Sequence, residues 1–197
     1  MGELFLHDLQ YYINKYGCKY FVETGTGKGT GIKHALQYPF RSLYSIEFMP
    51  QLHDECSRNF DDDRLTLLNL DSLSGLEYTL SLLDEKPCLF WLDAHFPGAD
   101  FHFNSYDRFT DQPDLNKPLK KEIEFIAAKR GASRDVFIID DLQIYEDGPF
   151  ELLNQEFKDE YGEDGIEFIE EAFKETHDFV RDYRHQGFLI LTPKRSE

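Results

Sequence analysis

The sequence predicts an α/β protein, built on a doubly wound, mostly parallel seven-stranded sheet that ends in an antiparallel hairpin. Five short apolar runs alternate with stretches of helical spacing, which is typical of parallel strands joined by helices. Acidic residues close four of these runs at nearly even intervals, about one strand-helix unit apart. Two final apolar runs are joined by a turn too short to hold a helix.

The five apolar runs predict buried strands, because they are apolar on both faces. They are KYFVET (19–24), SLYSIE (42–47), RLTLLNLD (64–71), PCLFWLD (87–93) and DVFIIDD (135–141). Helical spacing separates them, and Pro50 and Pro118 stand where a first helical turn accepts proline. Residues 149–175 also carry helical spacing, and the hairpin strands are expected at 177–183 and 187–193.

The length of 197 residues predicts a single domain, 1–197. Residues 94–117 fit neither a helix nor a strand, and we interpret this aromatic-rich stretch as a lid-like insertion. A net charge of −17 argues against a protein that binds nucleic acid or anionic lipid through its overall electrostatic potential. The sequence leaves open whether the chain forms a homo-oligomer.

Three cysteines, Cys18, Cys56 and Cys88, are widely separated and show no C-x-x-C spacing. They indicate neither a disulfide framework nor a zinc site and fit a reducing compartment. The sequence shows no signal peptide and no apolar run long enough to span a membrane. We therefore expect a cytoplasmic protein with no membrane partner.

A glycine-rich segment, ETGTGKGTG (23–31), follows the first predicted strand. A phosphate-binding loop of the G-x-x-x-x-G-K-[ST] type does not fit, because Lys28 is followed by Gly29 and the first glycine position holds Val22.

A dinucleotide fingerprint, G-x-G-x-x-G, fits the same segment in part. Gly25 and Gly27 match it, but its third glycine position holds Thr30. Glu47 stands about where a ribose ligand is expected. A nucleotide-dependent oxidoreductase of the NAD type therefore remains an alternative function.

The pattern E-x-G-x-G-x-G is met in full by Glu23, Gly25, Gly27 and Gly29. In this pattern, in its acidic strand ends and in its final hairpin, the chain resembles the class I S-adenosylmethionine-dependent methyltransferases, which have a Rossmann-like fold. Glycines allow the backbone to pass close to a bound cofactor. A crevice rimmed by carboxylates suits the cationic sulfonium of this cofactor.

The resemblance implies a cofactor site at the acidic strand ends. In that family the acidic residue after the second strand holds the ribose, which matches Glu47, and Phe48 would pack on the adenine. The position after the third strand contacts the adenine edge, which matches Asp71 and Ser72. The implied cofactor-binding residues are Glu23, Thr24, Gly25, Gly27, Gly29, Glu47, Phe48, Asp71, Ser72 and Asp93. Any one of these acidic residues alone is better explained as a helix cap.

Carboxylates also gather after the fourth and fifth predicted strands. Asp93 ends one, and Asp140 and Asp141 end the other. Three converging carboxylates repel one another unless a cation lies among them, and hard oxygen ligands favour Mg²⁺, Ca²⁺ or Mn²⁺. The arrangement is similar to that of metal-dependent small-molecule O-methyltransferases of the catechol and macrolide-sugar type. Asp140 and Asp141 could instead cap the following segment.

The resemblance implies a general base near this cluster. His95 is the first candidate, because imidazole titrates near neutral pH, and His102 is the second. The chain departs from the catechol-type enzymes, which have a lysine where it has Phe96.

We therefore expect a methyltransferase that uses S-adenosylmethionine and a divalent ion, Mg²⁺ first, to methylate a hydroxyl of a small polar or sugar-like acceptor. Asp93 and His95 would be its catalytic residues. The remaining alternative is a binding module that keeps the fold and the cofactor pocket without the chemistry.

Overall fold

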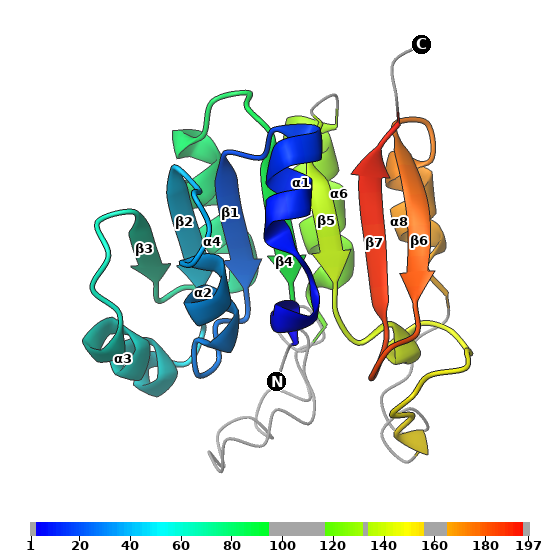
Figure 1. Cartoon of the computed structure of the whole chain (residues 1–197), viewed down its shortest axis with the longest axis horizontal. Coiled ribbons are helices and arrows are strands. Elements are labelled where there is room, and N and C mark those ends of the chain that lie inside the picture. The colour runs from blue at the N-terminus through cyan, green and yellow to red at the C-terminus, as the bar shows by residue number, and fades with distance from the viewer. Residues whose placement is uncertain (1–2, 95–116, 132–133, 156–164, 195–197) are drawn as a thin grey trace.

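A computed structural model describes residues 3–94, 117–131, 134–155 and 165–194 of the chain. The described part contains a seven-stranded sheet in the order β3-β2-β1-β4-β5-β7-β6 (Figure 1). Its first five strands are parallel, and β7 pairs antiparallel with both β5 and β6. The predicted fold class, including the C-terminal hairpin, is confirmed.

The strands follow the predicted apolar runs closely. They are β1 (Tyr20–Thr24), β2 (Ser42–Ile46), β3 (Leu65–Leu68), β4 (Cys88–Leu92), β5 (Val136–Ile139), β6 (His177–Asp182) and β7 (Phe188–Pro193). Strands β1, β4 and β5 are buried along their whole length, as expected of strands covered on both faces. Strand β3 is only half-buried, because it forms one edge of the sheet and has a neighbour on one side alone.

Helices cover both faces of the sheet. The described ones are α1 (Leu9–Tyr16), α2 (Thr30–Ala35), α3 (Pro50–Asn59), α4 (Ser72–Leu82), α6 (Leu119–Arg130) and α8 (Glu167–Phe173), with short 3₁₀ turns η1 (Leu4–Leu6) and η3 (Leu142–Ile144). Pro50 opens α3 and Pro118 precedes α6, as predicted. None of the helices in the described residues is long and apolar enough to cross a bilayer.

Two apolar clusters lie on opposite faces of the sheet because successive strand residues point to opposite sides. Val22 of β1 packs in one cluster with residues of α4, α6 and α8. Its neighbour Phe21 packs in the other cluster with residues of α1 and α2. Both faces of the central strands β1, β4 and β5 are thus covered, which leaves the ends of these strands accessible.

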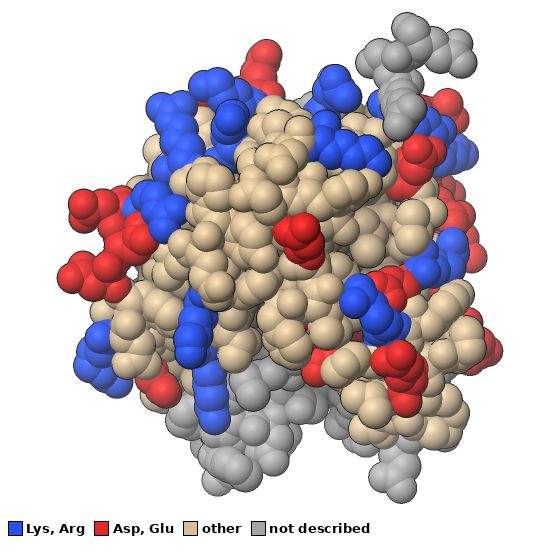
Figure 2. Space-filling model, in the orientation of Figure 1, with Lys and Arg blue, Asp and Glu red and all other residues tan. Residues whose placement is uncertain are grey.

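Basic residues precede each of the five parallel strands. Each strand from β1 to β5 has Lys or Arg within the two residues before it: Lys19, Arg41, Arg64, Lys86 and Arg134. In Figure 2 blue residues gather along the upper margin, where these strands begin in Figure 1. Three of them contact acidic side chains at the same end of the sheet: Arg41 and Lys86 contact Asp84, and Arg64 contacts Asp62.

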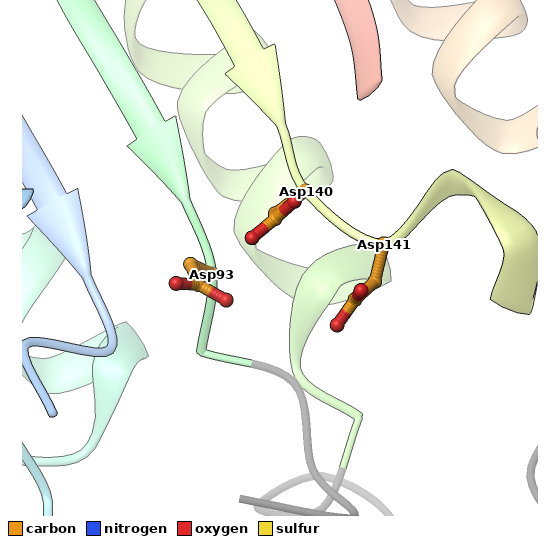
Figure 3. A group of neighbouring side chains, drawn as sticks. All are labelled: Asp93, Asp140 and Asp141. Atoms are coloured by element: carbon orange, nitrogen blue, oxygen red, sulfur yellow. The ribbon is translucent and has the colours of Figure 1, made fainter. Parts of the chain in front are cut away.

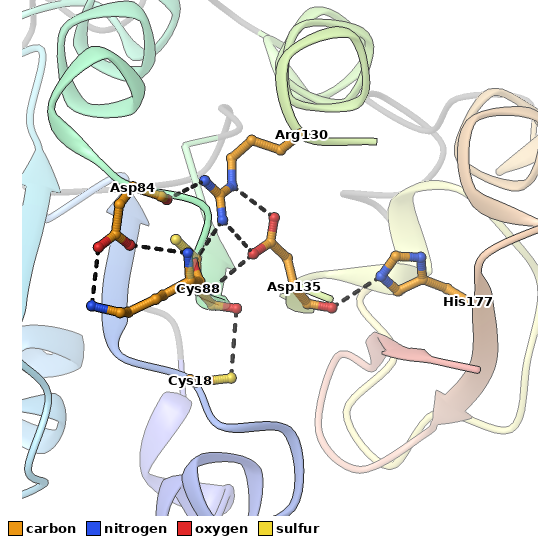
Figure 4. Close-up of polar contacts among 7 residues, drawn as sticks. Cys18, Asp84, Cys88, Arg130, Asp135 and His177 are labelled. Carbon is orange, nitrogen blue, oxygen red and sulfur yellow. Dashed lines mark hydrogen bonds and ion pairs between the residues drawn. The ribbon is translucent and has the colours of Figure 1, made fainter. Parts of the chain in front are cut away.

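A buried ion pair fixes the amino ends of β4 and β5 (Figure 4). Arg130 at the end of α6 donates from Nε and Nη2 to the two carboxylate oxygens of Asp135, at 2.8 and 2.9 Å. Their side chains are 7% and 1% exposed. Asp135 also accepts the amide of Cys88 at 2.7 Å, and the guanidinium donates to the carbonyls of Asp84 and Lys86. One charge pair therefore joins a helix to two strands.

We expect Asp135→Asn to lower the free energy of unfolding by about 3–5 kcal/mol, because the buried guanidinium of Arg130 loses its counter-charge. Urea unfolding followed by circular dichroism measures this. The control is Asp84→Asn, since the Asp84 side chain is 46% exposed beside Lys86 and should contribute about 1 kcal/mol or less. Equal losses in the two variants would contradict the assignment.

Candidate functional site

The candidate site lies where the strand order reverses. Strand β1 pairs with β2 on one side and β4 on the other, so the chain moves outward from this point in both directions. The carboxyl ends of β1 and β4 are level, with Thr24 opposite Leu92. In open α/β sheets ligands bind outside the strand ends at such a reversal.

The glycine-rich loop passes against the end of β4. Gly25 has φ +81°, a conformation that side chains rarely adopt, and a Cβ added there would overlap the backbone of Asp93 and Ala94. The amides of Gly25 and Thr26 donate to the carbonyl of Ile46 at 3.0 and 3.2 Å. Only glycine lets the chain turn here at this distance from β4.

Glu47, directly after β2, is held by backbone amides. It is 5% exposed, and its carboxylate accepts the amide of Gly27 at 2.8 Å and that of Met49 at 2.7 Å. Burial raises the pKa of this carboxyl, and the two amides act in the opposite direction. Each carboxylate oxygen can accept a further hydrogen bond, so Glu47 is placed to hold a donor such as a ribose hydroxyl.

Phe48 follows Glu47 and is 39% exposed. The side-chain amide of Asn69 donates to the carbonyls of Glu47 and Phe48 at 2.8 and 3.1 Å. This link fixes the backbone on which the predicted ribose and adenine contacts depend. Asn69 was not singled out from the sequence, because its contacts lie across the turn between β2 and α3.

Glu23 lies inside the protein, with its side chain between β2 and α2. It is 1% exposed, and Ser45 Oγ donates to its Oε2 at 2.5 Å. A Cβ added at Gly31 would overlap its other oxygen. Burial raises the pKa of Glu23 to about 8, an effect that the Ser45 bond opposes and the charge of Glu47 increases. Its carboxyl group is therefore mostly protonated at neutral pH.

Asp71 serves as the N-cap of α4. Its carboxylate accepts the amide and the hydroxyl of Ser74 at 3.0 and 2.7 Å, which is the capping role typical of this residue type. Ser72 is the first residue of α4, and Thr24 is fully buried at the end of β1. Contact of these three residues with a cofactor stays a prediction.

Three carboxylates meet at the ends of β4 and β5 (Figure 3). Asp93, Asp140 and Asp141 each offer an oxygen, and these atoms lie within 4.8 Å of one another. Burial, and next the charge of Asp141, raise the pKa of Asp93 well above its usual value. Asp141 adopts the left-handed conformation, with φ 52°, which is uncommon outside glycine and turns its carboxylate toward the cluster.

The geometry of the three carboxylates fits a hard divalent cation. Such ions take oxygen ligands, and carboxylates held this close repel one another without a positive charge between them. The candidate bases His95 and His102 fall outside the described residues, as does almost all of the predicted lid at 94–117.

No protein-family model and no curated protein matches this sequence. Solved structures do match it. An O-methyltransferase from Bacillus cereus in complex with SAH superposes with a TM-score of 0.54, at 14% identity, over 94% of this chain and 79% of that one. A Staphylococcus aureus protein, provisionally assigned as a caffeoyl-CoA O-methyltransferase, gives 0.56 at 11% identity, over 98% and 85%. The chain has the class I methyltransferase fold.

Another matching structure is named for a different acceptor. A Clostridium thermocellum structure, provisionally assigned as an rRNA methylase, gives a TM-score of 0.56 at 12% identity, over 94% of this chain and 96% of that one. Identities this low show the fold alone, and a fold does not determine the acceptor.

Position 25 requires glycine for two reasons: its φ is positive, and an added Cβ would overlap the backbone of Asp93. We expect Gly25→Ala to lower stability by several kcal/mol and to remove binding of adenosylhomocysteine, because the new Cβ displaces the end of β4. Thermal unfolding and calorimetry measure the two effects.

The matched control is Gly17→Ala. Gly17 has a similar φ of +77° but no atom within 4 Å of an added Cβ, so it should lose only about 1 kcal/mol. A loss as small in Gly25→Ala would show that its contact with Asp93 is unimportant.

Proposed function

We propose that the chain transfers a methyl group from S-adenosylmethionine to a hydroxyl of a small polar or sugar-like acceptor, with help from a divalent cation such as Mg²⁺. The observation that carries this proposal is the position of Asp93. Its backbone lies against Gly25 of the glycine-rich loop, and its carboxylate belongs to the cluster with Asp140 and Asp141. A cofactor site and a cation site would therefore adjoin at one residue.

The residues around the loop fit a cofactor without phosphate groups. S-adenosylmethionine supplies an electrophilic methyl group on a positively charged sulfur. Glu47 presents a fixed carboxylate for two ribose hydroxyls, and Phe48 offers a partly exposed ring for the adenine. The buried carboxylates at this edge favour a cation and disfavour a pyrophosphate.

The chain's own part in the reaction is to orient the acceptor and lower the cost of its ionisation. Mg²⁺, when bound, favours the ionised form of a hydroxyl that it holds. Asp93, Asp140 and Asp141 would hold the ion and thereby place the acceptor oxygen beside the loop. His95 stays our candidate for taking the proton, with His102 second.

The neighbouring structures support this class of reaction without deciding the acceptor. Two of them are described as O-methyltransferases, one in complex with SAH, and one is assigned to rRNA. The net charge of −17 favours a small acceptor over a polyanion. We propose further that 1–197 acts as one domain and that 94–117 closes over the acceptor.

Calorimetry with adenosylhomocysteine and with NAD tests the cofactor. We expect the first to bind with micromolar affinity and the second not to bind, because Thr30 replaces the third glycine of the dinucleotide fingerprint and the carboxylates of Asp93, Asp140 and Asp141 repel a pyrophosphate. NAD binding without adenosylhomocysteine binding would favour the oxidoreductase alternative. Cofactor binding without turnover on any hydroxyl acceptor would favour the inactive module.

The cation site is tested by titrating Mg²⁺ in two buffers of different ionisation enthalpy. Because the pKa of Asp93 is raised, Mg²⁺ should displace protons and bind more weakly as the pH falls. Asp93→Asn and Asp141→Asn should each weaken Mg²⁺ binding at least tenfold. The control is Asp178→Asn, at an exposed position on β6. An equal loss of Mg²⁺ affinity in the control would exclude the proposed cation site. Methyl transfer that continues in excess chelator would also exclude it.

A further inference from the structure

The end of β2 contacts the glycine-rich loop through consecutive residues. The carbonyl of Ile46 accepts two loop amides, and the carboxylate of Glu47 accepts that of Gly27. Ser45, the residue before them, makes its contact through its side chain, since its Oγ lies 2.5 Å from Oγ1 of Thr26. Strand β2 therefore determines the path of the loop at successive points.

Ser45 also bonds to β1. It stands opposite Glu23 in the parallel register, and its hydroxyl donates to Oε2 of that residue at 2.5 Å. The same hydroxyl also bonds that of Thr26, and either of the two can be the donor. The result is a buried chain of hydrogen bonds that joins Thr26, Ser45 and Glu23, which are 4%, 0% and 1% exposed.

We infer that Ser45 and Thr26 are positioning residues, whose paired hydroxyls hold the glycine-rich loop in the conformation that binds the cofactor. This inference rests on the proposed function. Ser45 is fully buried, so any effect of this residue on the cofactor acts through the residues that it bonds, Thr26 in the loop and Glu23 before it. Thr26 lies between Gly25 and Gly27, and its carbonyl accepts the amide of Gly29 at 2.8 Å.

Breaking this chain of hydrogen bonds raises the free energy of the formed loop. Without the Ser45 hydroxyl, an oxygen of Glu23 and the hydroxyl of Thr26 are left buried without their partners, and such groups are expensive to bury. The loop relieves this cost by moving Thr26 toward water. That movement also displaces the amide of Gly27 from the carboxylate of Glu47, so fewer molecules have a formed site.

The test is the dissociation constant for adenosylhomocysteine, measured by calorimetry well below each variant's melting temperature. Ser45→Ala and Thr26→Val should each weaken binding by about fivefold to tenfold, the value of one buried hydrogen bond. Because the two hydroxyls bond each other, the double variant should lose less than the product of the single losses. Thr26→Ser keeps the hydroxyl and should restore most of the affinity.

The control is Thr79→Val. Thr79 is fully buried on α4, and within the described structure its hydroxyl has no partner, so its loss should leave the dissociation constant unchanged. Unchanged affinity in Ser45→Ala and Thr26→Val, with only lower melting temperatures, would overturn the inference.

Failure of the wild-type chain to bind adenosylhomocysteine would overturn the proposed function instead. In that case, amide hydrogen exchange at Gly27 and Gly29 still measures whether the Ser45–Thr26 hydroxyl pair orders the loop. Exchange there should accelerate in Thr26→Val and not in Thr79→Val. Equal exchange in both variants would show that the hydroxyl pair does not order the loop.

Discussion

The cost of burying negative charge governs the carboxyl edge of this sheet. Glu23, Glu47 and Asp93 differ in what compensates for the burial of their carboxyl groups. Glu23 is mostly protonated and accepts a hydrogen bond from Ser45. Glu47 accepts two backbone amides, which oppose the effect of burial on its pKa. Asp93 lies against two further carboxylates, and this is the place where a positive ligand would lower the free energy most.

The parallel register of the strands brings these acidic residues into one small region. Because β1 pairs level with both β2 and β4, the residues that end all three strands lie side by side. The loop after β1 then has to pass between the end of β2, which supplies hydrogen-bond acceptors, and the end of β4, which leaves no room for a side chain at Gly25. The path of the loop follows from the sheet, and the glycines are what allow the chain to follow that path.

The sequence alone was enough to predict the strands, their mostly parallel arrangement and the hairpin, because apolar runs and their spacing are local signals. It also placed Asp93, Asp140 and Asp141 together, since parallel strands end at one edge. Local patterns could not show which way a side chain points. Glu23 faces the interior and Asp71 caps α4, although spacing alone groups both with Glu47. The pairs Arg130 with Asp135 and Ser45 with Thr26 join residues from different elements, which a single sequence does not reveal.

The carboxylates beyond the carboxyl ends of the strands give that edge of the sheet a negative potential. Glu47, Asp93 and Asp140 stand directly beyond the carboxyl ends of their strands. At the opposite end, the basic residues before β2, β3 and β4 contact carboxylates of their own. A small cation that approaches from solution is therefore drawn to one end of the protein before any contact forms. Its rate of encounter rises as ionic strength falls, over distances of about 10 Å at 0.1 M salt. Charge placement thus contributes to the speed of capture as well as to the strength of binding.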